Sequence, residues 1–229
     1  MTGLAVLALA DSRFPGGGHA HSGGVEEAAA RGLVNSITDL RGFLRGRLFG
    51  AGELQAVFAA AATHAAARGV AAGHWRELDA ELDARTPSPA QREASRAQGK
   101  GMLRAGRAAW PSPVLRELVA ATPRPHQPIV LGVLTATAGS APRDAALAAG
   151  YLAISGPASA GVRLLGLDPF EANAAVVALA SELDEIAEQA GRSAGTAPAE
   201  LPAPGAPALD LLAEAHDRHH REEVRLFAS

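Results

Sequence analysis

Apolar residues recur at helical spacing after residue 168, where the chain reads Asp168-Pro169-Phe170-Glu171. Asp168 is suited to cap a helix, Pro169 to occupy its first position, and Glu171 to complete a capping box. Beyond these residues the apolar positions step by three and four, at Val176, Leu179, Leu183, Ile186 and Ala190. This stripe predicts a helix that faces a core or a partner helix.

The same pattern recurs along most of the chain. Ser36 to Asp39 is a second capping signal, and apolar residues follow at Leu40, Phe43, Leu44 and Leu48. Further helices are predicted at residues 4–11, 24–31, 53–68, 74–85, 90–109, 113–121, 129–138 and 144–165. We expect the last to be interrupted at Gly156-Pro157, because proline lacks an amide donor. Hairpin dipeptides and β-type alternation are missing from the sequence, so the predicted fold class is all-α.

Residues 192–208, "RSAGTAPAELPAPGAPA", break this pattern, because Pro, Ala and Gly replace large apolar residues there. The composition is typical of an extended tether. We therefore expect a single compact domain of about nine to ten helices at residues 1–191. The tether at 192–208 and a C-terminal partner-docking arm at 209–229 would follow it.

The composition excludes several classes of function. The 229 residues carry a net charge of only −3 and no basic run, so neither nucleic acid nor an anionic membrane is an expected partner. Without cysteine, disulfides, thiolate metal sites and cysteine nucleophiles are impossible. The first apolar run, residues 4–10, is too short to cross a bilayer and lacks a preceding basic residue, which places the chain in the cytoplasm.

The glycine-rich stretch "SRFPGGGHAHSGGVEEA", residues 12–28, is the main candidate for chemistry. It lacks the lysine of a phosphate-binding P-loop, and His21 stands where a dinucleotide fingerprint needs its last glycine. Ser22 in "AHSGG" is close to the nucleophile elbow of serine hydrolases, but an all-α chain cannot provide the strand before that elbow. We therefore expect Ser22 to cap the next helix. The repeated glycines indicate positive φ angles or a close backbone approach.

Histidines and arginines offer further candidates. His19 and His21 would make only a weak metal site. His216 and His220 would share one helical face with Glu223, yet without a fixed third ligand they should bind metal weakly, so no metal site and no cofactor are expected. The cluster Arg85, Arg92, Arg96 and Arg104 is either a partner-contact surface or a solvated helical face.

The stretch "LADSRFPGGGHAHSGGVEEA" resembles the N-terminal signature of the urease accessory protein UreF family. The matching positions are Leu9, Ser12, Pro15, Gly17, His21, Ser22, Gly24 and Glu26. Three later stretches are similar to the family in the same order along the chain. They match through Arg85, Arg92, Ser95, Arg96 and Gly99, then through His126, Pro128 and Arg163, and at the C-terminus through Arg225, Leu226, Phe227 and Ser229. His19 stands where the family commonly has an aromatic residue.

This resemblance implies an all-α, non-catalytic scaffold that forms a homodimer. It also implies that the scaffold binds the accessory protein UreD (also called UreH) and recruits the GTPase UreG, so that nickel reaches apo-urease. The partner-binding residues it implies are Pro15, Gly17, His21, Ser22, Glu26, Arg85, Arg92, Arg96, Gly99, Arg225, Leu226 and Phe227. Two alternatives stay open at this point: a serine hydrolase that uses Ser22, and an unrelated helical ligand-binding or regulatory bundle.

Overall fold

A computed structural model of the chain describes residues 2–11, 13–15 and 22–226, with the side chains of all of these except Thr2 and residues 220–226. No strand occurs in these ranges, which confirms the all-α prediction. The helices are α1 (Thr2–Ala10), α2 (Val25–Ala30), α3 (Ile37–Arg47), α4 (Glu53–Arg68), α5 (Ala72–Ala84), α6 (Pro89–Ala109), α7 (Pro113–Ala121), α8 (Gln127–Thr137), α9 (Pro142–Leu165), α10 (Pro169–Val177), α11 (Ala180–Ser193) and α12 (Pro207–Leu226). A π-helical turn, η2 (Leu48–Gly52), joins α3 to α4, and a 3₁₀ turn, η3 (Pro198–Glu200), follows α11.

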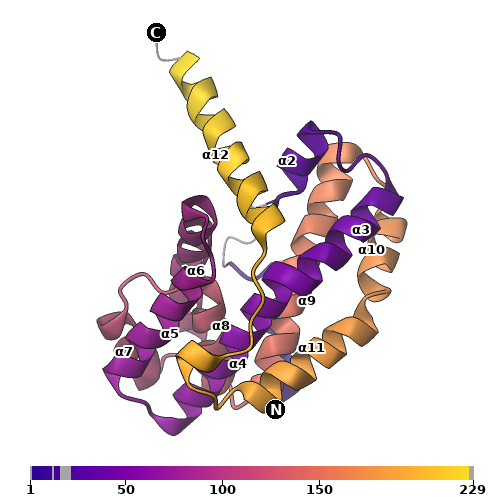
Figure 1. The fold of residues 1–229 in the computed structure, drawn as a ribbon. Helices are drawn as coiled ribbons and strands as arrows, with labels where there is room; N and C mark the ends of the chain where they lie inside the picture. Colours follow the sequence, from indigo (N-terminus) through magenta and orange to yellow (C-terminus); the bar gives the residue numbers. More distant parts are fainter. Residues whose placement is uncertain (1, 12, 16–21, 227–229) are drawn as a thin grey trace.

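Helices α4, α8 and α9 form the centre of the bundle (Figure 1). Helix α11 covers α9 and α4 on one side, and α6 covers α8 on the other. Helix α9 has the length and hydropathy of a membrane span, but 61% of its most apolar window is buried inside the bundle. Its apolar character is therefore that of a core helix.

The central helices touch through small residues. Gly132 of α8 lies so close to α4 that a Cβ added there would stand 2.3 Å from the carbonyl oxygen of Ala59. Six alanines at positions 56, 59, 60, 61, 62 and 65 of α4 are buried. Because van der Waals attraction grows with the number of close atom pairs, this short separation contributes much of the cohesion in a chain with only 4% aromatic residues.

Two capping predictions are confirmed. The Ser36 hydroxyl accepts a hydrogen bond from the Asp39 amide at 3.2 Å, and the Asp39 carboxylate accepts one from the Asn35 amide. The Asp168 carboxylate accepts from the Phe170 amide at 2.7 Å. Both side chains thus satisfy amides that a helix start leaves without intrahelical partners.

Two other expectations about helices are wrong. The apolar stripe after Asp168 belongs to two helices, because α10 ends at Val177 and α11 begins at Ala180. Helix α9 continues through Pro157 without a break, since its neighbours satisfy the carbonyl that the proline leaves without an amide partner.

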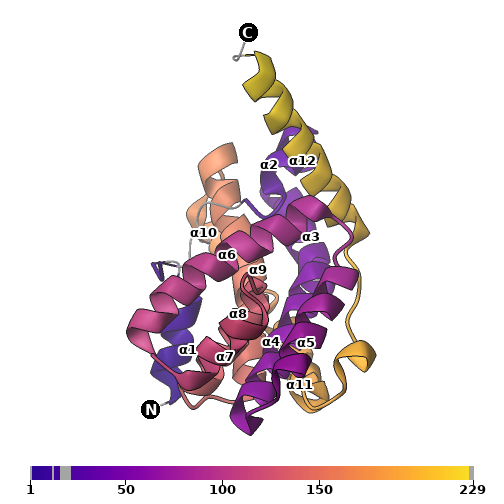
Figure 2. The same cartoon turned by 90° about the vertical axis from the view of Figure 1, so that its left-hand side faces the viewer.

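Residues 192–208, expected to form a tether, lie against the bundle. Leu201 is buried, η3 contacts α5, and the Ala199 carbonyl accepts a hydrogen bond from Arg85. Helix α12 then rises past α2 and α6, and its far end projects from the bundle (Figures 1 and 2).

The close contact of α4 with α8 generates a stability prediction. Gly132→Ala should lower the free energy of unfolding by about 1–3 kcal/mol, because the new methyl group meets backbone that cannot move aside. Gly42→Ala is the matched control on the exposed side of α3, where an added Cβ meets nothing within 4 Å. Gly42→Ala should raise the free energy of unfolding by up to about 1 kcal/mol, because alanine has a higher helix propensity than glycine. Urea titration measures both, and equal effects would contradict the packing argument.

Candidate functional site

An ion-pair cluster joins α5, α6 and the start of α8 around Arg96. One nitrogen of its guanidinium, Nη2, lies 2.9 Å from Asp79 Oδ2 and 2.7 Å from Asp83 Oδ2. A second nitrogen donates to the carbonyl oxygen of Arg124. Arg96 is thus bonded within the bundle, which differs from the solvated face that spacing alone permits.

His126 completes this cluster from within the protein, where only 1% of its side chain is exposed. Its Nε2 lies 2.8 Å from Asp83 Oδ1 and its Nδ1 lies 3.0 Å from Ser95 Oγ. The Gln127 amide donates to Ser95 Oγ, which leaves the Ser95 hydroxyl hydrogen free to point at Nδ1 of His126. A neutral His126 ring then carries its hydrogen on Nε2 and donates it to Asp83. Sequence reasoning matched His126 and Ser95 to the family but did not pair them.

Burial sets the direction of the pKa shift for His126 but not for Asp83 in this cluster. Burial lowers the pKa of His126, against the opposing charge of Asp79. Burial alone would raise the pKa of Asp83, but its hydrogen bond from His126 and the charges of His126 and Arg96 hold that pKa below its usual value. The native cluster therefore favours a neutral histidine beside ionised carboxylates.

The same cluster is the candidate metal site among the described residues, since ligand atoms of Asp79, Asp83 and His126 lie within 4.8 Å of one another. The Arg96 guanidinium already bonds to both carboxylates. A divalent cation would have to displace this charge, so the donor set fits an ion-pair network rather than a metal. His216 and His220 were the pair considered as a weak metal site, and the side chain of His220 lies outside the described residues.

The other predicted residues of α5 and α6 hold the same junction together. Arg85 bonds to Glu81 and to the carbonyl of Ala199, and its guanidinium lies 5.6 Å from the centre of the Phe58 ring. Arg92 donates to the carbonyls of Thr86 and Pro87. At Gly99, an added Cβ would stand 2.3 Å from the Pro125 carbonyl oxygen, so only glycine permits this approach.

The described part of the N-terminal motif turns sharply into α2. Gly23 and Gly24 have φ angles of +63° and +96°, which explains two of the glycines. Gly24 occupies the N-cap position and no side chain caps α2, so the expectation that Ser22 caps this helix is wrong. Pro15 is exposed, while Gly17 and His21 lie outside the described residues.

Helix α2 faces α12 through its two glutamates. Glu27 is 2% exposed and accepts hydrogen bonds from Arg31 at 2.7 Å and from His219 Nδ1 at 3.2 Å. The exposed Glu26 lies 4.0 Å from His216 Nε2. The structure therefore brings the N-terminal motif and the C-terminal arm together. Arg225 and Leu226 lie in the last turn of α12 without described side chains, and Phe227 lies beyond the described residues.

The acidic side chains of α12 also cap α6, a contact that sequence reasoning missed. Glu214 Oε1 accepts from the Ser88 hydroxyl at 2.6 Å and from the Ala90 amide at 3.0 Å. Asp210 Oδ1 accepts from the Gln91 side chain and the Ser88 amide. Asp210 and Glu214 are four residues apart and so share one face of α12. This spacing was the signal in the sequence that could have indicated an acidic face on α12. Acidic groups at a helix N-terminus are stabilised by the exposed amides and the helix dipole.

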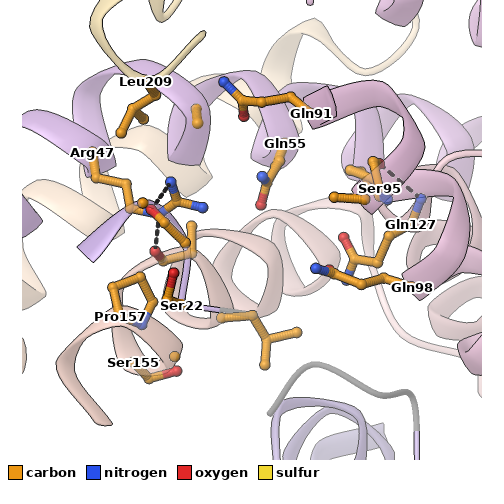
Figure 3. A pocket seen from close by; sticks show the side chains of 18 of the residues that line it. Ser22, Arg47, Gln55, Gln91, Ser95, Gln98, Gln127, Ser155, Pro157 and Leu209 are labelled. Carbon is orange, nitrogen blue, oxygen red and sulfur yellow. Dashed lines mark hydrogen bonds between the residues drawn. The ribbon is translucent and has the colours of Figure 1, made fainter. Parts of the chain in front are cut away.

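A hollow of about 1950 Å³ lies between these elements. Its wall includes Ser22 and Arg47 on one side and Ser95 and Gln127 on the other, and Figure 3 shows these polar side chains around it. The hollow thus separates the Arg96 cluster from the N-terminal motif, and α12 passes along its edge.

Helical packing, arginines bonded within the bundle and the contact between α2 and α12 define a class of protein. They describe an all-α helical bundle whose distinctive residues hold helices and connecting segments in place. The described ranges contain no strand, so they offer no support for a strand-to-helix elbow at Ser22.

Comparisons with known proteins agree with this class. The family model for UreF matches residues 34–180. The chain is 46% identical to the urease accessory protein UreF of Mycobacterium bovis BCG and 45% identical to that of Mycobacterium tuberculosis, over the full length of both chains in each case. It is also 43% identical to the UreF of Mycolicibacterium vanbaalenii over full length. The chain belongs to the UreF family of urease accessory proteins, so it is an accessory protein and not an enzyme.

The buried histidine generates a pH prediction. Because the folded pKa of His126 lies below the unfolded value of 6.5, the unfolded chain takes up the proton first, and stability falls as the pH drops below about 6.5. Each such proton changes the free energy of unfolding by about 1.4 kcal/mol per pH unit. His126→Gln should make the slope between about pH 6.5 and pH 5 shallower in urea titrations. His74→Gln, outside the cluster, should leave it unchanged; an unaltered slope in the His126 variant would refute the assignment.

Proposed function

We propose that this chain is a scaffold for urease maturation that binds UreD (UreH) and recruits the GTPase UreG, so that nickel is inserted into apo-urease. The observation that carries the proposal is similarity along the whole chain to proteins named urease accessory protein UreF. The family's role requires protein surfaces and no catalytic group in this chain. Its own residues would therefore act by binding and orienting partners in the cytoplasm.

The proposed UreD surface is formed where α2 and α12 meet. Ser22 and Glu26 lie on the α2 side, and the projecting end of α12 carries Arg225, Leu226 and, beyond the described residues, Phe227. Pro15, Gly17 and His21 belong to the same N-terminal motif. An amphipathic helix that extends from a bundle offers apolar groups to a partner's groove, which is a common mode of recognition.

Arg85, Arg92, Arg96 and Gly99 enter the proposal in a different way. Their hydrogen bonds and close contacts run to α5, α6 and the segments beside them. We propose that they support partner binding by fixing the α5–α6 junction, where Asp210 and Glu214 of α12 cap α6. Removal of one of them would then displace a surface rather than delete a direct contact.

A homodimer is the second part of the proposal. Large apolar side chains remain exposed on α1 and α10, including Leu4 at 76% and Phe170 at 83%. Both helices pack on α9. Exposed apolar side chains of this kind suit a second copy of this chain, because a twofold interface buries the same patch on both subunits.

Co-expression with UreD and UreG tests this function. Size-exclusion chromatography with light scattering should show a complex of the three proteins, and the chain alone should have twice its monomer mass of 23.3 kDa. A chain lacking residues 217–229 should lose most of its capture of UreD and keep its helical spectrum, because the helices that form the core lie before residue 217. If the three soluble proteins elute separately, the scaffold proposal fails. Full capture by the truncated chain would remove the arm from the binding surface.

A further inference from the structure

Pro157 removes one of the backbone hydrogen bonds of α9. In a regular helix the amide of residue 157 would donate to the carbonyl of Ala153, and proline has no amide hydrogen. Ala153 is 3% exposed, and a buried carbonyl without a donor is costly. The missing donor comes from another helix, because Arg47 Nε lies 2.7 Å from the Ala153 carbonyl oxygen.

The same guanidinium holds the N-terminal motif. Arg47 Nη1 donates to the carbonyl oxygen of Gly23 at 2.7 Å, and Figure 3 shows both bonds next to Ser22 and Pro157. A Cβ at Gly23 would lie 2.7 Å from Cγ of Pro157 and 3.2 Å from Cζ of Arg47. The motif segment is therefore pressed against the proline turn of α9 with one arginine bonded to both.

The position of Arg47 in the chain suits this task. It is the last residue of α3, directly before the π-helical turn η2, where the helical path widens. Among the described residues no carboxylate forms an ion pair with Arg47, and burial lowers its pKa to about 10. The side chain is half-buried and lines the hollow, and from there its guanidinium reaches a carbonyl of α9 and a carbonyl of the N-terminal motif.

We infer that Arg47 is a positioning residue that fixes the N-terminal motif for partner binding. It does so by donating to two carbonyls, that of Gly23 and that of Ala153, which Pro157 leaves without an amide donor. This inference rests on the proposed function, because UreD is the partner whose capture would depend on it. The bond to Ala153 anchors the guanidinium, and the bond to Gly23 sets the path of the chain into α2. Ser22 directly precedes Gly23, and Glu26 lies three residues after it in the first turn of α2, so displacement of Gly23 moves both.

Four variants separate positioning from stability. Arg47→Met removes both bonds and leaves the Ala153 carbonyl without its donor, so it should lower the melting temperature and weaken UreD capture by about tenfold. In Arg47→Met with Pro157→Ala, the new amide of residue 157 can donate to Ala153 within α9. Its melting temperature should return toward wild type while capture stays weak, because Gly23 still lacks Arg47. Pro157→Ala alone and the neighbouring Gly156→Ala keep the Gly23 bond and should capture UreD as wild type does.

Hydrogen exchange of residues 23–30 in the chain alone supplies a readout independent of UreD. These amides should exchange faster in both variants that lack Arg47 and at the wild-type rate in the other two. Capture that recovers together with the melting temperature in the double variant would overturn the inference, as would unchanged exchange in Arg47→Met. If wild type captures no UreD, the scaffold proposal fails, and the exchange rates alone then decide whether Arg47 holds the motif.

Discussion

The structure depends on how closely its central helices approach one another. Gly132 places α8 against the α4 backbone, and Gly106 of α6 and Gly150 of α9 receive Leu134 and Leu183, whose side chains would clash at 2.4 Å with an added Cβ. Such contacts are specific in shape, because no larger residue fits at the glycine and a smaller one at the leucine would leave a cavity. They fix α8 against α4, α6 against α8, and α11 against α9. Helices α2 and α12 are attached to this frame.

From this frame, polar contacts extend to α2 and to α12. The Arg96 cluster joins α5 and α6 to the start of α8, while Asp210 and Glu214 attach α12 to the N-terminus of α6. Glu27 joins α12 to α2. Buried or half-buried polar groups of this kind specify geometry, because each unpaired group would be costly. The N-terminal motif and the C-terminal helix, nearly 200 residues apart in the chain, meet as a result.

Local signals in the sequence predicted local structure well. The caps at Ser36 and Asp168, the all-α class and most helix positions followed from spacing and capping chemistry. The errors arose where tertiary contacts overrode a local rule. Arg47 supplies the donor that lets α9 run through Pro157, and the turn at Ala178 and Leu179 splits one apolar stripe between two helices. The Ser22 cap failed because Gly24 begins α2 in a left-handed conformation.

The site was predictable as a set of residues but not as an arrangement. Family resemblance indicated Arg96, His126 and the N-terminal motif, whereas nothing in the spacing of Asp79, Asp83 and Arg96 shows that they form ion pairs. The central claim is that α2 and α12 form one binding surface for UreD. Hydrogen exchange of the wild-type chain with and without UreD tests it directly. The account predicts that amides of residues 23–30 and 207–226 gain protection together, and protection of α1 and α10 with neither of these segments would contradict it.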